Sequence, residues 1–442
     1  MNPEQVKFSS SAVEATSAES ELVIFRSELT SYNPGSNKFV RINLAVADKS
    51  WIDFSDSCLS LKFTNRSHDT ASASTSETAV KTQLSNLIKS ITILNSQGEQ
   101  VEYINNYNLI SNIIDDYTMG SNHKVGVEQI LAGGSNDGDP NNASEVAGAN
   151  STSEADGSSL TMVDRLMTGT TSGQYLLPLG YLIGQAPSII LELCDPAECL
   201  KINTAANTVA AYAVSEVQIR AKQIRFNSAF NANFEATLAS AGDMGVNYIT
   251  ESFLHNQASL NSGISGQQTV PFSVNPRSAK YILACMRLEA NVANRDKFSL
   301  GCRSSCALGE YSFEISGKMY PSQPIQVSNT NYAQAYSNLL DCLGQIGNLN
   351  HNTLITKGTT RTLFYSNTQG TDQKFVAGLV LEDFNSATNP STYSGANLST
   401  VGQMSFRPKI DTALSGAYRV DFFTSIDMSL HITADGRMFS VR

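Results

Sequence analysis

The sequence is poor in charged residues. Only 16% of its 442 residues are Asp, Glu, Lys or Arg, against about 25% in an average soluble protein. A disordered acidic chain needs high charge and few apolar residues, and a coiled coil needs an excess of Ala, Glu, Lys, Leu and Arg, so both classes are excluded. The 40 acidic residues outnumber the 30 basic ones, and the net charge of −10 excludes a general basic nucleic-acid binder.

Long apolar runs are also missing. The longest are Tyr175–Ile183 and Ile189–Leu193, and both are far shorter than the roughly 20 residues that cross a membrane. Residues 1–20 lack the basic stretch and following apolar stretch of a secretory signal. They are rich in Ser, Glu and Ala without periodicity, which predicts a flexible N-terminal arm. Seven cysteines, an odd number, fit free thiols, so we expect synthesis in the cytosol.

Motifs that carry chemistry are missing as well. The sequence has no phosphate-binding G-x-x-x-x-G-K-[ST], no G-x-S-x-G and no H-E-x-x-H. None of its five histidines has another His or Cys at ligand spacing. His431 lies in an alternating strand pattern, where an ordinary surface position is expected. The sequence therefore indicates no catalytic, cofactor-binding or metal-binding residues, and we expect a protein that is not an enzyme and has no cofactor.

Two cysteine pairs could in principle bind zinc. Cys194 and Cys199 lie in the first half of the chain, and Cys302 and Cys306 in the second. Structural zinc sites usually combine C-x₂₋₄-C pairs with tight turns and often with His. The spacings and the separation of the pairs favour small buried side chains at strand ends.

Clusters of charge have equally plain interpretations. Asp115 and Asp116, at the end of a predicted helix, are expected to face solvent. The sequence Asp-Gly-Asp at 137–139 lacks the ligand series and closing Glu of a calcium loop. The densest basic group, Arg220–Arg225, has no interleaved exposed aromatics, which favours a solvated or subunit-facing surface over a nucleic-acid groove.

The pattern that is present is that of short strands separated by turns. Strand signals include Phe39–Leu44, Leu59–Phe63 and Ile88–Leu94. Ser96-Gln97-Gly98 predicts a hairpin turn. The apolar residues of Tyr107–Tyr117 recur at helical spacing and predict one short amphipathic helix.

The second half repeats this strand, turn, strand and helix order. Tyr311–Ile315 alternates, Ser316-Gly317 turns the chain, and Tyr332–Leu340 has helical spacing. The turn glycines Gly98 and Gly317 lie 219 positions apart, a period too long for a solenoid or propeller. The sequence therefore predicts an all-β protein with a few short helices, built as two tandem β-sandwiches.

The predicted boundaries follow from the repeat. After the arm at 1–20, we expect a first sandwich over residues 21–226 and a second over residues 227–442, joined by a helix from Phe230. Residues 133–159 contain no aromatic residue, no Lys and no Arg, so they cannot bury enough apolar surface to offset their ordering entropy. They predict a polar surface insertion, and a second one is expected around 385–400.

Four stretches carry a resemblance to a known family. Phe313–Ile325, with the helix pattern after it, and Arg277–Leu283 resemble the second half of double jelly-roll major capsid proteins of tailless icosahedral DNA viruses. These include virophages, Polinton-like and adintovirus-like elements and bacterial relatives. Leu87–Ile93 and Tyr175–Tyr181 are similar to the first half of that family.

The resemblance implies a function and partners. It implies two jelly rolls per chain, three chains per pseudo-hexagonal capsomer of an icosahedral virion, and contacts between capsomers. Minor capsid or penton proteins and an internal membrane are further expected partners, through the inward N-terminal arm, without sequence-specific nucleic-acid binding. The expected location is the virion capsid after synthesis in the host cytoplasm, without secretion.

Two other classes stay open from the residues. A carbohydrate-binding or adhesive β-sandwich virion protein would use exposed aromatics in loops, such as Tyr365 and Tyr393. A glycoside hydrolase would need two carboxylates about 5–10 Å apart across a cleft, and no pair stands out in the sequence. The enzyme is the least favoured of the three.

Overall fold

The computed structural model describes most of the chain in separate stretches. They are residues 18–69, 80–118, 159–172, 175–202, 208–292, 303–328, 330–344, 373–382 and 394–442, with short pieces at 131, 145–146, 294, 300–301, 364–365 and 369. Most of the predicted N-terminal arm lies outside these residues. Its last three residues belong to strand β1 (Ala18–Arg26), which is paired from Ala18 onward.

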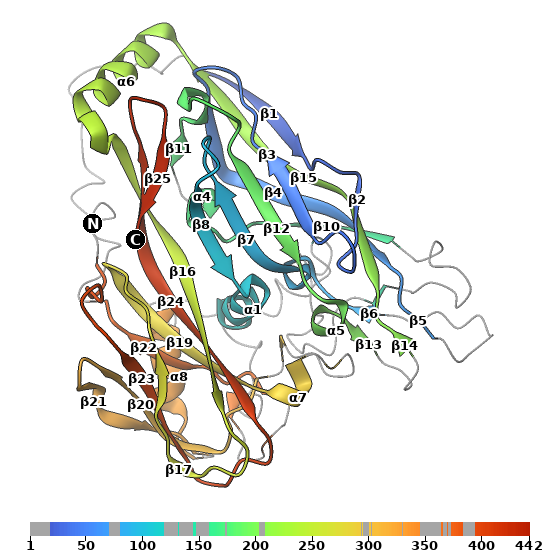
Figure 1. The fold of residues 1–442 in the computed structure, drawn as a ribbon, viewed down its shortest axis with the longest axis vertical. Coiled ribbons are helices and arrows are strands. Elements are labelled where there is room, and N and C mark those ends of the chain that lie inside the picture. The colour runs from blue at the N-terminus through green and yellow to red at the C-terminus, as the bar shows by residue number, and fades with distance from the viewer. Residues whose placement is uncertain are drawn as a thin grey trace.

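The first half of the chain forms two sheets that face each other (Figure 1). One sheet has the order β1, β15 (Tyr212–Phe226), β4 (Trp51–Asn65) and β10 (Ser159–Asp164). The other has the order β3 (Phe39–Asn43), β12 (Ser188–Leu193), β7 (Ile88–Leu94) and β8 (Gln100–Asn105). Short strands at the margins are β2 (Ser31–Tyr32), β5 (His68–Asp69), β6 (Val80–Lys81), β9 (Glu145–Val146), β11 (Leu176–Leu177), β13 (Lys201–Ile202) and β14 (Thr208–Val209).

The second half forms another pair of sheets. The first has the order β16 (Val246–Leu260), β24 (Tyr418–Ile432), β19 (Ala279–Leu288) and β22 (Ala377–Val380), with β25 (Met438–Val441) added beside β24. The second has β18 (Val270–Phe272), β23 (Met404–Ile410), β20 (Leu308–Ile315) and β21 (Lys318–Gln326), with β17 (Gly266–Gln267) also on β23.

The two halves have the same strand order. In the described part of the chain, and leaving aside β25 and the two-residue strands, each half has eight strands. One sheet joins the first, eighth, third and sixth of them, and the other joins the second, seventh, fourth and fifth. This is the order of a jelly roll. The prediction of an all-β chain with two tandem jelly-roll sandwiches is confirmed.

The helices occupy equivalent places in the two halves. Helix α1 (Tyr107–Thr118) follows the fifth strand of the first half, and α8 (Ala333–Cys342) follows the fifth strand of the second. Both helix predictions are confirmed. The other helical elements are α4 (Gly169–Ser172), α5 (Pro196–Cys199), α6 (Ser228–Ala241), α7 (Glu289–Val292), η2 (Leu84–Leu87), η5 (Leu179–Tyr181) and η6 (Gly242–Met244). None of the helices in the described residues is long and apolar enough to span a membrane.

Alternation along the strands explains most of the core. Val217, Ile219 and Ala221 on β15 are all buried, as their period-two spacing predicts. Strand β24 departs from this rule because almost every one of its residues is buried. A strand covered on both faces reads as a nearly continuous buried run. The polar residues of β24 therefore need partners inside the protein.

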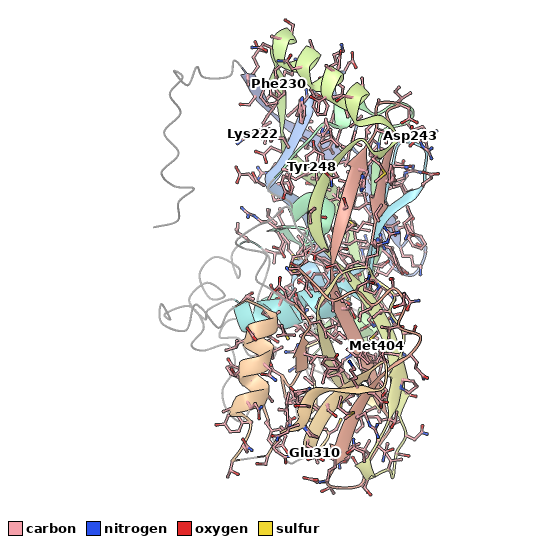
Figure 2. The ribbon with its side chains drawn as sticks, turned by 90° about the vertical axis from the view of Figure 1, so that its left-hand side faces the viewer. Lys222, Phe230, Asp243, Tyr248, Glu310 and Met404 are labelled. Atoms are coloured by element: carbon pink, nitrogen blue, oxygen red, sulfur yellow. The ribbon has the colours of Figure 1, made fainter. Side chains whose placement is uncertain are left out.

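The connection between the halves lies at one end of the molecule. Strand β15 ends at Phe226, α6 follows at the top of the view, and β16 starts at Val246 and descends into the second sandwich (Figure 1). Phe230 on α6 and Glu310 on β20 mark opposite ends of the long axis (Figure 2). The connection packs against the first sandwich, because Trp51 of β4 makes edge contacts with Phe230 and Phe234 of α6.

The predicted polar insertions are only partly within the described residues. Of 133–159, these include Glu145–Val146, which pairs with β6, and Ser159 in β10. Of 385–400, residues 394–400 are described, and they are not all on the surface. Leu398 is buried, and Ala396 pairs with Ala279, the first residue of β19.

Candidate functional site

The most elaborate polar structure in the described residues is the junction between the two sandwiches. Strand β8, the fifth strand of the first sandwich, lies against β16 and β25 of the second. The backbone carbonyl of Val101 on β8 accepts hydrogen bonds from Ser440 Oγ at 2.5 Å and from Arg442 Nη2 at 2.7 Å. Side chains of the C-terminal segment thus satisfy an edge-strand acceptor of the first sandwich.

A buried carboxylate occupies the middle of this junction. Glu102 on β8 is fully buried. It accepts hydrogen bonds from the backbone N–H of Gly169 and Thr170, at 2.7 and 3.0 Å, and from Ser252 Oγ on β16, at 2.6 Å. A buried carboxylate is tolerated when donors surround it, and here one donor comes from the other sandwich.

A second cluster corrects a prediction made from the sequence. Asp115 and Asp116 were expected to face solvent, but both are buried at the end of α1. Asp116 forms an ion pair with Arg303 and another with Lys374, whose Nζ lies 2.5 Å from Asp116 Oδ1. Both cations belong to the second half of the chain and are themselves buried. The prediction was wrong because the second sandwich covers this helix end.

The groups around Asp116 are also shielded from solvent. The neighbouring Tyr117 hydroxyl donates to the backbone carbonyl of Lys374, and burial raises the pKa of Tyr117 well above its ordinary value. Burial alone would lower the pKa of Arg303, but the neighbouring groups, Asp116 first among them, together outweigh burial and raise the pKa. Arg303 therefore stays ionised next to the Asp116 carboxylate.

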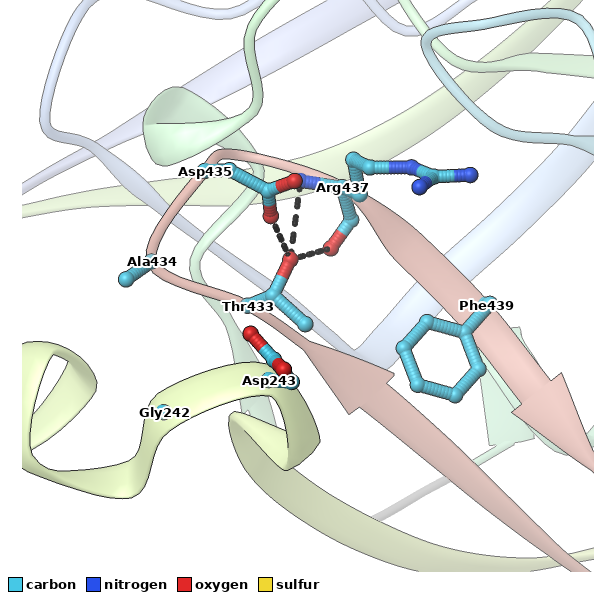
Figure 3. A pocket seen from close by; sticks show the side chains of 7 residues that line it. All are labelled: Gly242, Asp243, Thr433, Ala434, Asp435, Arg437 and Phe439. Carbon is cyan, nitrogen blue, oxygen red and sulfur yellow. Dashed lines mark hydrogen bonds between the residues drawn. The ribbon is translucent and has the colours of Figure 1, made fainter.

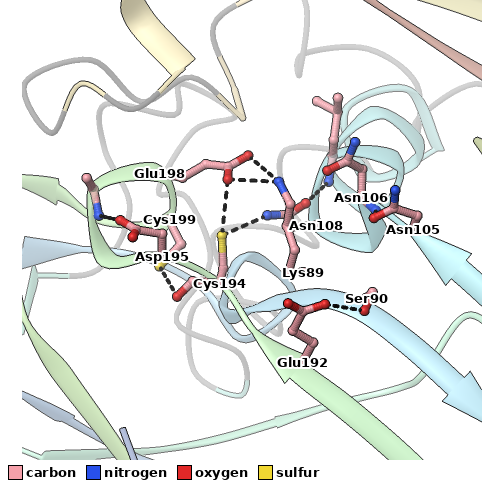
Figure 4. Close-up of polar contacts among 12 residues, drawn as sticks. Lys89, Ser90, Asn105, Asn106, Asn108, Glu192, Cys194, Asp195, Glu198 and Cys199 are labelled. Carbon is pink, nitrogen blue, oxygen red and sulfur yellow. Dashed lines mark hydrogen bonds and ion pairs between the residues drawn. The ribbon is translucent and has the colours of Figure 1, made fainter. Parts of the chain in front are cut away.

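A third cluster is a chain of charges that crosses the junction. Lys89 Nζ donates to both carboxylate oxygens of Glu198, at 2.8 and 2.9 Å (Figure 4). Glu198 Oε1 lies 3.7 Å from Nη1 of Arg287 on β19. Arg287 in turn donates to Asp421 Oδ2 on β24 through Nε at 3.1 Å and Nη2 at 2.8 Å.

The same chain returns to the first sandwich through a histidine. His255 Nε2 on β16 lies 3.0 Å from Asp421 Oδ1 and 2.9 Å from Asn106 Nδ2, just before α1. Burial by itself would raise the pKa of Asp421, but Arg287 and His255 outweigh it and lower the pKa to about 2. Asp421 is thus an ionised carboxylate at neutral pH, paired inside the protein.

Other predicted positions also have structural roles. His431 was expected on the surface, yet it is buried: Ser429 Oγ lies 2.9 Å from its Nε2, and the Met244 carbonyl lies 2.9 Å from its Nδ1. The prediction failed because β24 is covered on both faces. Lys222 Nζ lies 3.6 Å from Asp56 Oδ2, and Arg225 Nη2 lies 2.9 Å from Glu21 Oε1. Two of the three basic side chains of the group Arg220–Arg225 are therefore paired with carboxylates on the surface.

The cysteine pairs do not form a shared centre in the described residues. Cys194 and Cys199 are free and buried near Glu198 (Figure 4). A hydrogen bond with Cys199, together with burial, raises the pKa of Cys194, so its thiol is not activated. Cys306 is free and buried as well, and Cys302 lies outside the described residues. Within those residues no three His, Cys, Asp or Glu side chains are grouped so as to hold a metal ion.

One surface hollow in the described part of the chain contains two carboxylates. The hollow, of about 400 Å³, lies between η6 and the β24–β25 hairpin (Figure 3). Its carboxylates, Asp243 and Asp435, are exposed to water, and Thr433 Oγ1 is already bonded to the Arg437 carbonyl at 3.2 Å. Tyr365, considered above as an exposed aromatic for a sugar site, is buried and donates to the Leu308 carbonyl. Tyr393 lies outside the described residues.

Comparison with known proteins gives matches at the level of structure. No protein-family model and no curated protein sequence matches the chain. The PBCV-1 virus capsid aligns over 97% of this chain and 98% of its own, with a TM-score of 0.59 and 11% identity. The Faustovirus major capsid protein aligns over 97% of this chain and 94% of its own, with a TM-score of 0.61 and 9% identity. The Sputnik virophage structure aligns over 99% of this chain and 91% of its own, with a TM-score of 0.58 and 9% identity.

The fold is the double jelly roll of these capsid proteins. The double jelly-roll alignment extends over nearly the full length of each partner, so it includes both sandwiches in tandem and the way they are joined. The family resemblance noted in the sequence is therefore confirmed at the level of fold.

Sequence reasoning missed the residues that join the sandwiches of this double jelly roll. Arg287 stands in the largely apolar strand Ala279–Leu288, and Asp421 stands between the apolar residues Val420 and Phe422 of Tyr418–Ile432. A charge within such a run is a signal, because a buried charge is rarely left without a partner. The sequence does not name the partner, since the paired residues are 134 positions apart.

Proposed function

We propose that this chain is a major capsid protein, a structural subunit that forms trimeric pseudo-hexagonal capsomers of an icosahedral virion. The observation that carries the proposal is the pair of jelly rolls in one chain, aligned along nearly its whole length with the PBCV-1 virus capsid. The corresponding location is the virion, after synthesis in the host cytoplasm. The function is structural rather than enzymatic.

The junction between the sandwiches supports this role. A trimer imitates a hexagon only when the two jelly rolls of each chain keep one fixed relation to each other. Here Glu102, Asp116 and Asp421 are buried ionisable groups with partners across or beside the junction. Sliding or separating the sandwiches would leave these charges without partners, at a cost of several kcal/mol each. The two sandwiches therefore behave as one rigid building block.

The surface chemistry fits repeated contacts between copies. Few residues are charged, so broad neighbouring surfaces meet without strong like-charge repulsion. The net charge of −10 suits a shell that does not grip its genome directly. Contacts with minor capsid proteins, or with an internal membrane through the N-terminal arm, belong to the same proposal.

The test is the mass of the purified protein in solution. Light scattering coupled to size-exclusion chromatography is expected to give three times the mass of the 47.6 kDa chain. Negative-stain images of the same peak should show six-sided particles. A protein that stays monomeric at the highest soluble concentration would overturn the proposal. Binding of the monomer to a glycan array would then favour the carbohydrate-binding alternative.

A further inference from the structure

Exposed apolar side chains are concentrated at one edge of the first sandwich. Leu22 and Ile24 on β1 are 65% and 45% exposed, and Leu29 and Phe39 are 52% and 54% exposed. All four lie within 18 residues of each other in the chain, on β1, on β3 or between them. Strands β1 and β3 contact each other, so these side chains surround the edge that the first and second strands form.

In the described part of the chain neither strand of this edge has a second strand partner, apart from one bridge between Ser27 and Ile42, beside which the Glu28 N–H donates to the Arg41 carbonyl at 3.0 Å. Strand β1 ends its sheet and hydrogen-bonds only to β15 among the described strands, and β3 likewise pairs only with β12. A long edge strand with apolar neighbours is a ready template for association. Surface apolar groups scattered singly need no explanation, but four at one sheet edge do.

The equivalent edge of the second sandwich is already occupied within the chain. Its first and second strands are β16 and β18, and none of their described residues is a large exposed hydrophobic side chain. Tyr103 and Asn105 of β8 line one hollow together with His255 of β16 and Val274 after β18. Inside one chain, therefore, the first-strand edge of the second sandwich meets the fifth-strand edge of the first.

The fifth-strand edge of the second sandwich is left over. Among the described strands, β21 pairs only with β20. Its Tyr320 is 38% exposed, close to the 37% of Tyr103 on β8. Tyr320 borders a hollow of about 360 Å³ whose lining includes Ile315 and Leu398. The one charged residue of β21 is Lys318. The strand therefore does not repel a binding partner through a strong electrostatic field.

We propose that the β1/β3 edge of one copy binds the β21 edge of a second copy. The contact would repeat, between chains, the arrangement that β16/β18 and β8 already have within the chain. Each copy then offers one free edge of each kind, which makes the contact heterologous, so copies join head to tail and close into a ring. The inference rests on the proposed function, since three copies are what gives a ring of six sandwiches.

The first experiment places charge on the edge. In Leu22→Asp with Ile24→Asp, both changed side chains are already exposed, so the chain should still fold, with a far-ultraviolet circular dichroism spectrum like that of the unaltered protein. Light scattering is expected to show monomer, with the trimer fraction reduced at least tenfold. Met244→Asp is the matched control, because Met244 is 62% exposed but lies at η6, away from the edge. It should remain a trimer.

The second experiment detects the contact between the β1/β3 edge and the β21 edge by cross-linking. Leu22→Cys is combined with Tyr320→Cys in a Cys58→Ser background, because Cys58 is the half-exposed one of the described cysteines. A short bis-maleimide should then give covalent dimers and trimers in denaturing gels. Leu22→Cys with Tyr103→Cys is the control and should give at least tenfold less product, because β8 already faces its own second sandwich.

The outcomes separate this inference from the proposed function. A monomeric unaltered protein would overturn both. An unaltered trimer whose edge variant also remains a trimer, and whose cysteine pair does not cross-link, would overturn the inference and leave the function standing. A monomeric edge variant that keeps its circular dichroism spectrum, together with cross-links specific to Tyr320→Cys, supports it.

Discussion

The helices α1 and α8 occupy the same place in two sandwiches of the same strand order, yet their surroundings differ. Helix α1 is almost entirely buried, and Asp116 near its end is paired with two buried cations. Helix α8 has four buried residues, and its Asp341 is exposed. The difference teaches that two sandwiches can share one strand order, whereas the position of each in the chain decides which of its surfaces is covered.

The largest expected effect tests this contrast between the helices. Asp116→Ala should leave Arg303 and Lys374 buried without their carboxylate. We expect the free energy of unfolding to fall by about 3–5 kcal/mol, as for other broken buried pairs. The measurement is urea denaturation followed by fluorescence.

The matched substitution in the second sandwich is Asp341→Ala. Because this side chain faces water, the free energy of unfolding should change by no more than about 0.5 kcal/mol. Equal losses for the two substitutions would mean that the two helix ends are equivalent after all, and the contrast between them would be lost.

A smaller effect is expected from the chain of charges that crosses the junction. The pKa of Asp421 is lowered from 3.8 to about 2 in the folded protein. Its ionised form therefore stabilises the fold above about pH 4, and this contribution, about 2–3 kcal/mol, is lost as the pH falls through 2. Asp421→Asn should be less stable at pH 7 by that amount.

The decisive readout is the slope of stability against pH. Unfolding curves of the unaltered protein and of Asp421→Asn should converge between pH 4 and pH 2. Parallel curves over that interval would show that Asp421 is not ionised against Arg287 and His255. Asp435→Asn, at an exposed position, is the control and should leave the slope unchanged.

The smallest expected change in the free energy of unfolding comes from the close packing of the two sandwiches at Gly169. A Cβ at Gly169 in the first sandwich would lie 2.7 Å from Thr250 Oγ1 and 2.8 Å from the Glu251 carbonyl in the second. We expect Gly169→Ala to cost about 1–2 kcal/mol through overpacking. Gly402→Ala, where nothing lies within 4 Å of the added carbon, should be neutral in the same denaturation assay.

Much of the fold could be read from local pattern. The strand Ile88–Leu94, the turn at Gly98 and the helix after it all appear where alternation, turn residues and helical spacing put them. The positive φ of Gly98 and of Gly317, 82° and 76°, suits the residue type that tolerates it best. The repeat of these signals was enough to predict two sandwiches.

The candidate site could not be read in this way. His431 and Asp116 were both assigned to the surface on the pattern of their own segments, and both are buried. Their own segments were interpreted correctly as a strand and a helix end. What was missing is the second layer of protein that covers them, and local periodicity reports only one neighbouring layer.

The sequence by itself determined the elements, because strand alternation, turn chemistry and helical spacing act between residues a few positions apart. The tertiary structure alone decided which charges meet. Arg303 and Lys374 reach Asp116 from 187 and 258 positions away, and a carboxylate is stable at such a depth only where folding brings cations to it. That pairing is set by how two sandwiches pack together, which no single segment encodes.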